Sequence, residues 1–198
     1  MAKIARDSLL TLEAYAKQRP ELRAKAIAHK RARTVHLGEH VTLLFEDETT
    51  IRYQVQEMLR IEKTFEEAGI QDELDAYNPL IPDGSNLKAT MLVEYEDEAE
   101  RRDALARLRG IEDGVWLQVG AEARVTPIAD EDLDRETEDK TSSVHFLRFE
   151  LTPAMIAAWK GGAVVAMGVD HPAYHAQIEL SPAQREALAA DFAQSGVA

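Results

Sequence analysis

One glutamate and two histidines, residue types that bind metal ions, occupy positions in this chain that should face the interior. Apolar side chains recur in residues 49–68 at about 100° per residue, the spacing of one helix face. Glu62 falls near the middle of that apolar stripe. A buried carboxylate must be paired, protonated or bound to a cation, because burial of a bare charge is costly. The pattern therefore marks Glu62 as a candidate functional residue.

The two histidines belong to predicted strands. His145 has the same two-residue phase as the apolar side chains of residues 143–151, and His171 continues the apolar phase of residues 164–170. Two imidazoles and one carboxylate form the ligand set of non-haem iron sites and of some zinc sites. The sequence thus predicts a divalent metal, such as iron or zinc, bound by Glu62, His145 and His171.

Three further polar residues are expected at the rim of such a site. Gln54 and Glu66 flank the apolar stripe of the predicted helix, and Asp170 directly precedes His171. An aspartate beside a histidine can orient a general base, although adjacent strand residues point to opposite faces. No HxH, HExxH or ExxH spacing anchors the metal in the sequence.

Glu62 has a second interpretation, in which it pairs with an arginine such as Arg124 or Arg148. In that case the carboxylate belongs to a structural salt bridge and binds no metal. The two interpretations differ in what surrounds the carboxylate, which the sequence leaves open.

Cysteine is absent from all 198 residues. Its absence excludes disulfides, zinc–thiolate sites, iron–sulfur ligation and thiol catalysis by this chain. The sequence also contains no GxSxG, P-loop or GxGxxG motif, so it does not support a serine hydrolase or a common nucleotide-binding site.

The net charge of −13 is unevenly distributed. Residues 1–36 carry a net charge of +6 and the rest of the chain −19. An acidic body argues against nucleic acid as the main ligand. The basic segment is either a docking surface for an acidic partner or a solvated helix face. No apolar run approaches the roughly 18 residues of a membrane span, and the start lacks a secretory apolar region, so we expect a cytoplasmic protein.

The elements predict a single α+β domain with a largely antiparallel or mixed sheet. Residues 1–33 form a helical segment, and residues 34–87 a hairpin plus a long helix. A β-α-β-β plan then occurs twice, in residues 88–128 and 143–180, and a last helix covers residues 181–194.

Several boundaries follow from local signals. Pro20 should open a second N-terminal helix, and Gly69 should end the helix of residues 49–68. Residues 130–140 are acidic and read as a solvated connector. The strands are expected at 34–37, 41–46, 89–96, 115–119, 124–128, 143–151, 164–170 and 174–180.

Five stretches carry a resemblance to known proteins: RPE at 19–21, IAHK at 27–30, YQVQEMLRIE at 53–62, AYNPLIPDG at 76–84 and VHFLRF at 144–149. Over nearly its whole length the chain resembles an uncharacterised bacterial family, classed as a domain of unknown function. Members are often encoded beside a rubrerythrin-like protein and an iron–sulfur oxidoreductase of the heterodisulfide-reductase type. The resemblance implies a connection to peroxide handling or electron transfer, and it supplies no site residues.

The leading hypothesis is an accessory protein of a cytoplasmic redox or oxidative-stress system, working with rubrerythrin-like and iron–sulfur partners. The alternative is a metal-dependent enzyme that uses Glu62, His145 and His171. A second alternative is a non-catalytic interaction module with Glu62 in a salt bridge. The sequence does not determine whether the protein is an enzyme, which substrate it has, or its oligomeric state.

Overall fold

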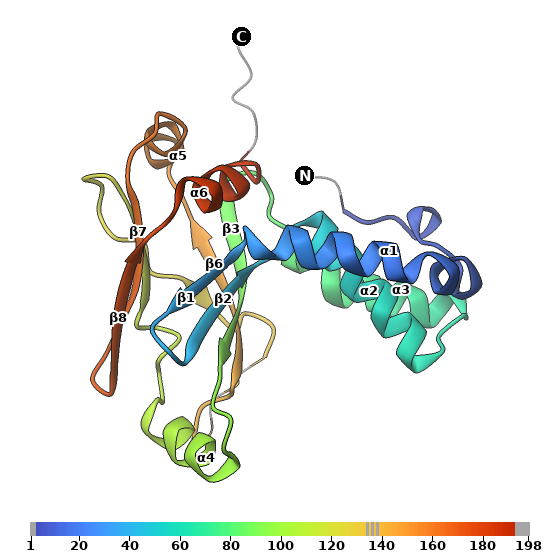
Figure 1. Cartoon of the computed structure of the whole chain (residues 1–198), viewed down its shortest axis with the longest axis horizontal. Coiled ribbons are helices and arrows are strands. Elements are labelled where there is room, and N and C mark those ends of the chain that lie inside the picture. The colour runs from blue at the N-terminus through green and yellow to red at the C-terminus, as the bar shows by residue number, and fades with distance from the viewer. Residues whose placement is uncertain (1–2, 134, 136, 138, 193–198) are drawn as a thin grey trace.

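A computed structural model describes residues 3–192 except 134, 136 and 138, and divides them into a helical part and a β part (Figure 1). The helical part contains the short turns η1 (Arg6–Ser8) and η2 (Asn78–Leu80) and the helices α1 (Leu12–Arg31), α2 (Glu48–Glu62) and α3 (Glu67–Tyr77). The β part contains β1 (Thr34–Leu37), β2 (Val41–Phe45), β3 (Asn86–Val93), β4 (Val115–Val119), β5 (Ile128–Ala129), β6 (Val144–Glu150), β7 (Val165–His171) and β8 (Tyr174–Glu179), with α4 (Glu98–Arg107), α5 (Pro153–Lys160) and α6 (Pro182–Ala189). Among the described residues, no helix combines the length and apolar character that a membrane span requires.

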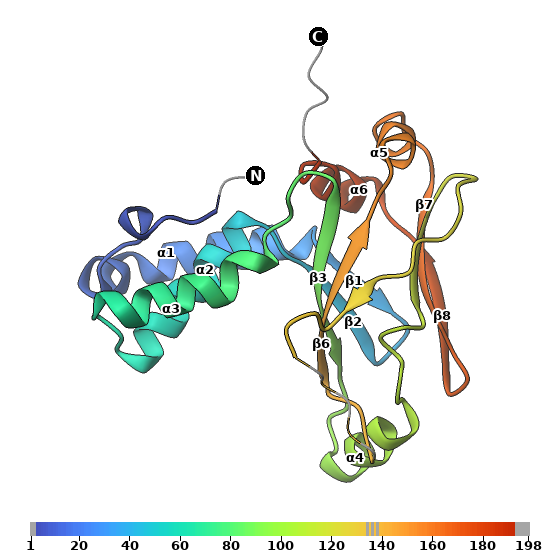
Figure 2. The same ribbon diagram turned by 180° about the vertical axis from the view of Figure 1, so that it is seen from behind.

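Two antiparallel sheets enclose the larger core. One has the strand order β1-β2-β3-β6-β5 and the other β4-β7-β8. Buried side chains alternate along β3 and β6, as expected for strands with one face on a core. Side chains of both sheets belong to one buried cluster. Helix α4 lies at one end of the sheets, and α5 and α6 lie at the other (Figures 1 and 2). The predicted α+β class with antiparallel pairing is confirmed.

The repeated plan holds for three of its four elements. The units β3-α4-β4 and β6-α5-β7 both pass from the five-stranded to the three-stranded sheet, and β3 pairs with β6 as β4 pairs with β7. The fourth strands differ, because β8 pairs with β7 whereas β5 crosses back to β6. An isolated antiparallel bridge between Leu117 and Val125 is the part of the expected hairpin that forms. Pro127 follows that bridge and has no N–H with which to continue it.

The helix predicted at 49–68 is two helices, which corrects the prediction at Gly69. Helix α2 ends at Glu62, and Lys63 has a left-handed backbone with φ of 55°. Helix α3 then begins at Glu67, so Gly69 lies inside it. The apolar stripe of α2 is buried only as far as Leu59, and beyond that residue the chain turns away to form α3.

The N-terminal segment also differs from expectation, because α1 is one continuous helix through Pro20. A proline inside a helix removes the hydrogen bond to the carbonyl four residues earlier, here that of Ala16. Ala16 is exposed, so water can satisfy its carbonyl. Helix α1 packs against α2 partly through Glu57, which binds Arg19 at 2.7 Å and also pairs with Arg60 at 3.1 Å.

Candidate metal centre

His145 is the centre of the candidate site. It lies on β6 in the same alternation as the buried residues Leu147 and Phe149, as the sequence predicted. Its exposed fraction is 0%, so the imidazole is enclosed at the inner face of the five-stranded sheet. Both ring nitrogens must therefore find their partners within the protein.

Asp130 supplies the partner of one ring nitrogen. Its Oδ2 lies 2.6 Å from Nδ1 of His145, and its Oδ1 accepts a hydrogen bond from the backbone N–H of Phe146 at 2.9 Å. The backbone N–H of Asp130 donates in turn to the carbonyl of Phe146 at 2.8 Å. The φ of Asp130 is 47°, a left-handed conformation that aspartate adopts more readily than most residues. The turn after β5 is thus shaped to aim this carboxylate at the imidazole.

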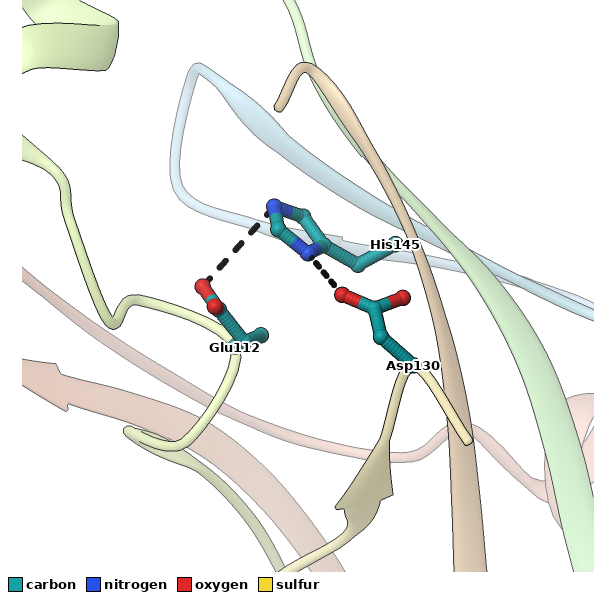
Figure 3. Close-up of side chains that lie close together, drawn as sticks. All are labelled: Glu112, Asp130 and His145. Atoms are coloured by element: carbon teal, nitrogen blue, oxygen red, sulfur yellow. Dashed lines mark hydrogen bonds and ion pairs between the residues drawn. The ribbon is translucent and has the colours of Figure 1, made fainter. Parts of the chain in front are cut away.

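Oxygen atoms surround the other nitrogen. Nε2 of His145 lies 3.0 Å from the hydroxyl of Thr141, 3.1 Å from the carbonyl of Ser142 and 3.8 Å from Oε2 of Glu112. Glu112 comes from the turn between α4 and β4, and its carboxylate points at the ring (Figure 3). The Thr141 hydroxyl lies 3.5 Å from the same oxygen of Glu112. Nε2 of His145, the Thr141 hydroxyl and Oε2 of Glu112, all of which can bind a metal, therefore face one point.

The spacing of those donors fits a small divalent cation. Atoms separated by 3.0, 3.5 and 3.8 Å share a point about 2.0 Å from each, a distance typical of metal bonds to nitrogen and oxygen. Glu112 and His145 would then be ligands with Thr141. Asp130 would orient the ring from the opposite nitrogen, as outer carboxylates commonly do for metal-bound histidines. Among the described residues, Glu112, Asp130 and His145 form a group of donors within 4.8 Å of one another.

The same cluster can also hold a proton. Nδ1 faces a carboxylate and Nε2 faces the Ser142 carbonyl, and both of those groups only accept hydrogen bonds. A doubly protonated ring can donate to both, but it has no lone pair for a metal. A metal bound at Nε2 would therefore require that nitrogen to carry no proton.

The chain matches the family described as protein of unknown function (DUF3501) over residues 3–192. It belongs to this family. A crystal structure described as a novel protein of unknown function from Burkholderia pseudomallei K96243 is 60% identical in sequence, with a TM-score of 0.92. The match covers 97% of this chain and 100% of that chain. No curated protein matches. The predicted resemblance to an uncharacterised domain family is thus confirmed.

In this DUF3501 chain, two of the three predicted metal ligands lie away from His145. Glu62 is exposed at the last position of α2 in the helical part, which corrects its predicted burial. His171 ends β7, where its Nε2 donates to the carbonyl of Arg109 at 2.9 Å and its Nδ1 accepts from the N–H of Ala173 at 3.1 Å. Neither residue belongs to the donor group around His145.

The predicted rim residues are likewise dispersed. Gln54 is half-buried on α2, and Glu66 is exposed just before α3. Asp170 is exposed on β7, where it pairs with Arg124 at 2.7 Å and with His175 at 2.8 Å. These contacts leave none of the three at the His145 cluster.

The arginines considered as alternative partners of Glu62 have other carboxylate partners. Arg124 binds Asp170, and its guanidinium lies 3.7 Å from the centre of the Trp116 ring. Arg148 binds Glu131 at 2.6 Å. Glu62 therefore forms the predicted salt bridge with neither Arg124 nor Arg148.

Sequence reasoning missed Glu112 and Asp130. Asp130 lies at the start of the segment predicted as a solvated connector, yet its side chain is only 10% exposed. Both residues are far from His145 along the chain, and neither follows a periodic apolar pattern. The one local signal was the position of Asp130 directly after a short apolar strand.

Proposed function

We propose that this protein binds one divalent cation through His145, Glu112 and Thr141 and acts as an accessory protein in a cytoplasmic redox or oxidative-stress system. The observation that carries the metal proposal is the enclosed imidazole of His145. One of its nitrogens is held by Asp130 at 2.6 Å, and the other faces Glu112 at 3.8 Å. This is the arrangement of a histidine ligand with its orienting carboxylate.

Burial of the cluster favours binding over catalysis. The side chains of His145, Asp130 and Glu112 are 0%, 10% and 11% exposed. A catalytic metal needs an open coordination position, and a general base must reach its substrate. The enclosed cluster meets neither need as it stands, so the metal-dependent enzyme of the sequence analysis is the less supported alternative.

The redox context is proposed from the family resemblance. A chain without cysteine supplies no thiol and no iron–sulfur ligand, so partners must carry that chemistry. Rubrerythrin-like and iron–sulfur proteins are the partners that the resemblance implies. The net charges of +6 in residues 1–36 and −19 elsewhere suit electrostatic docking to such partners.

Metal analysis of protein purified without a histidine tag tests the cation site. Titration of the metal-free protein with Zn²⁺, Mn²⁺ or anaerobic Fe²⁺ should reach about one equivalent. Glu112→Gln and His145→Asn should each abolish binding, and Glu62→Gln should leave it intact as the control. Circular dichroism of each variant would verify folding. Unchanged metal binding by a folded Glu112→Gln variant, or no binding by the wild type, would contradict the site.

Co-expression with each proposed partner tests the accessory role separately. Complexes held by surface charge weaken as ionic strength rises, because salt screens exposed charges. We expect co-elution in gel filtration at low salt and dissociation at high salt. Absence of a complex with either partner at low salt would contradict the accessory role while leaving the metal site intact.

A further inference from the structure

A cleft of about 620 Å³ lies between the helical part and the outer face of the five-stranded sheet. Its size falls within the range of small-molecule sites, roughly 300–1,000 Å³. The lining residues come from α3, η2, β3, β6 and the segments after β2 and β5, and they include Glu46, Glu73, Leu80, Lys88, Phe146 and Arg148. Glu112, Asp130 and His145 are not among them, so the cleft is distinct from the metal centre.

The two cationic side chains of the cleft already have partners. Lys88 donates through Nζ to the carbonyl of Pro79 at 2.6 Å, and burial lowers the pKa of this lysine. Arg148 makes a two-pronged contact with Glu131 at 2.6 and 2.7 Å, and it also binds Glu150. Among the described residues, neither side chain forms an ion pair with Glu46 or Glu73.

Glu46 is one of those acids, and it is 7% exposed. Its Oε1 accepts from the hydroxyl of Thr90 at 2.7 Å, and its Oε2 accepts from the hydroxyl of Thr50 at 2.5 Å. Among the described residues, no ion pair involves the side chain of Glu46. A buried carboxylate held only by hydroxyls retains the capacity to bind a cation.

Glu73 is the second of these acids in the cleft. Its Oε2 is buried and has no hydrogen-bond partner within the described part of the chain. Burial raises the pKa of Glu73, and the nearby charges of Glu62 and Asp72 add to that rise. A buried acceptor left without a donor destabilises the folded protein, so a ligand that donates to Glu73 would relieve that penalty.

We propose that this cleft binds an aliphatic diamine or polyamine, with its ammonium groups at Glu46 and Glu73. An ammonium group has three donors and no acceptor, which matches two carboxylates that lack cationic partners. Pro79, Leu80 and Phe146 provide apolar wall for the carbon chain. A slender alkyl ammonium can also reach the nearly enclosed Glu46, which a bulky head group cannot.

Calorimetric titration with 1,6-diaminohexane and with spermidine tests the proposal. The diol of the same length, 1,6-hexanediol, is the uncharged control. Wild-type protein should bind the amines saturably and the diol not at all. Glu73→Gln keeps the shape and removes the charge, and it should weaken amine binding about tenfold or more. Glu46→Gln should do the same, whereas Glu122→Gln, at an exposed position after β4, should bind like the wild type.

Several results would overturn the proposal. These are equal binding of the diol and the diamine, amine affinity unchanged in Glu73→Gln, or no binding of either amine at millimolar concentration. Binding of a lysine-containing peptide without binding of the free amines would assign the cleft to a protein side chain instead. If Glu46→Gln fails to fold, Glu73→Gln alone decides, because Glu73 is only half-buried. Repeating the titration with chelator-treated protein separates this result from the metal proposal, since amine binding should be unaffected.

Discussion

Oδ2 of Asp130 lies 2.6 Å from Nδ1 of His145, and the aspartate that makes this contact has a φ of 47°. The backbone of Asp130 is locked by reciprocal contacts with Phe146, which pairs the turn to β6. The contact therefore fixes the rotation of the imidazole. Its other nitrogen then faces Glu112, together with the Thr141 hydroxyl and the Ser142 carbonyl.

Asp130→Asn tests that contact. Asparagine tolerates the left-handed backbone and keeps the shape, but it withdraws the negative charge behind the ring. Loss of such an orienting partner commonly weakens metal affinity by about 10–100-fold. Competition titration with a chromophoric chelator measures the change, with Asp103→Asn on exposed α4 as the control. A cation affinity equal to that of the wild type would remove Asp130 from the site.

Glu57 should make stability depend on acid. The hydrogen bonds from Arg19 lower its pKa to about 2, and those from Tyr15 and Arg60 act in the same direction. Because the folded pKa lies below the ordinary value of 4.5, this stabilisation is present above about pH 4.5 and lost as pH falls toward 2. Glu57→Gln should cost about 2–3 kcal/mol at neutral pH, and the cost should shrink with acidification.

Urea denaturation of the wild type and Glu57→Gln at several pH values measures this difference. Glu13→Gln is the matched control, because Glu13 makes an exposed pair with Lys17. Such exposed pairs contribute about 0–1 kcal/mol. A Glu57→Gln deficit that stays constant from neutral to acidic pH would show that the carboxylate charge contributes little.

The sequence predicted the strands well, apart from the one expected at 124–128, because alternation shows directly which side chains face a core. The inward placement of His145 followed from the buried residues of the same phase on β6. Periodicity could not show at which residue the rest of the protein stops burying the apolar face of a helix. Glu62 has the phase of Ile51 and Leu59, but the buried part of the stripe ends at Leu59 and α2 itself ends at Glu62, so Glu62 is exposed.

The candidate site was predictable only in part, for a related reason. Glu112 and Asp130 reach His145 through turns, where side-chain direction follows no period. The left-handed backbone of Asp130 aims its carboxylate inward, and nothing in the neighbouring residues requires that conformation. Only the pairing of β5 with β6 brings this turn beside His145.

Glu62→Ala should be nearly neutral, in contrast to the cost that burial of this carboxylate would have implied. The side chain is exposed, and it forms no ion pair or hydrogen bond with the described residues. Surface substitutions of this kind change the free energy of unfolding by about 0.5 kcal/mol or less. Chemical denaturation measures the effect. A loss of about 2 kcal/mol or more would contradict the exposed position of Glu62.

An ion pair between Arg33 and Asp191 joins the segment after α1 to the segment after α6. The two side chains are 1% and 2% exposed. Arg33 also donates to the carbonyls of Phe45 at 2.9 Å, Ala187 at 2.9 Å and Glu46 at 3.0 Å. It thereby connects the segment after α1 with β2 and α6. Arg33→Met should lower the free energy of unfolding by about 3–5 kcal/mol, because it leaves a buried carboxylate and three carbonyls without their donor.

The cost of Arg33→Met should also grow with pH. Burial raises the pKa of Asp191 to about 6, and the hydrogen bond and charge of Arg33 oppose that rise. A raised folded pKa means that stability is present at low pH and is lost as pH rises through the folded value. Without Arg33 the pKa of Asp191 rises further, so the variant should lose more than the wild type between about pH 5 and about pH 8. Denaturation at both pH values measures this loss. Adding Asp191→Asn to the Arg33→Met variant should remove the pH-dependent part of this loss. A loss of stability that is the same at both pH values would contradict the coupling between Arg33 and the pKa of Asp191.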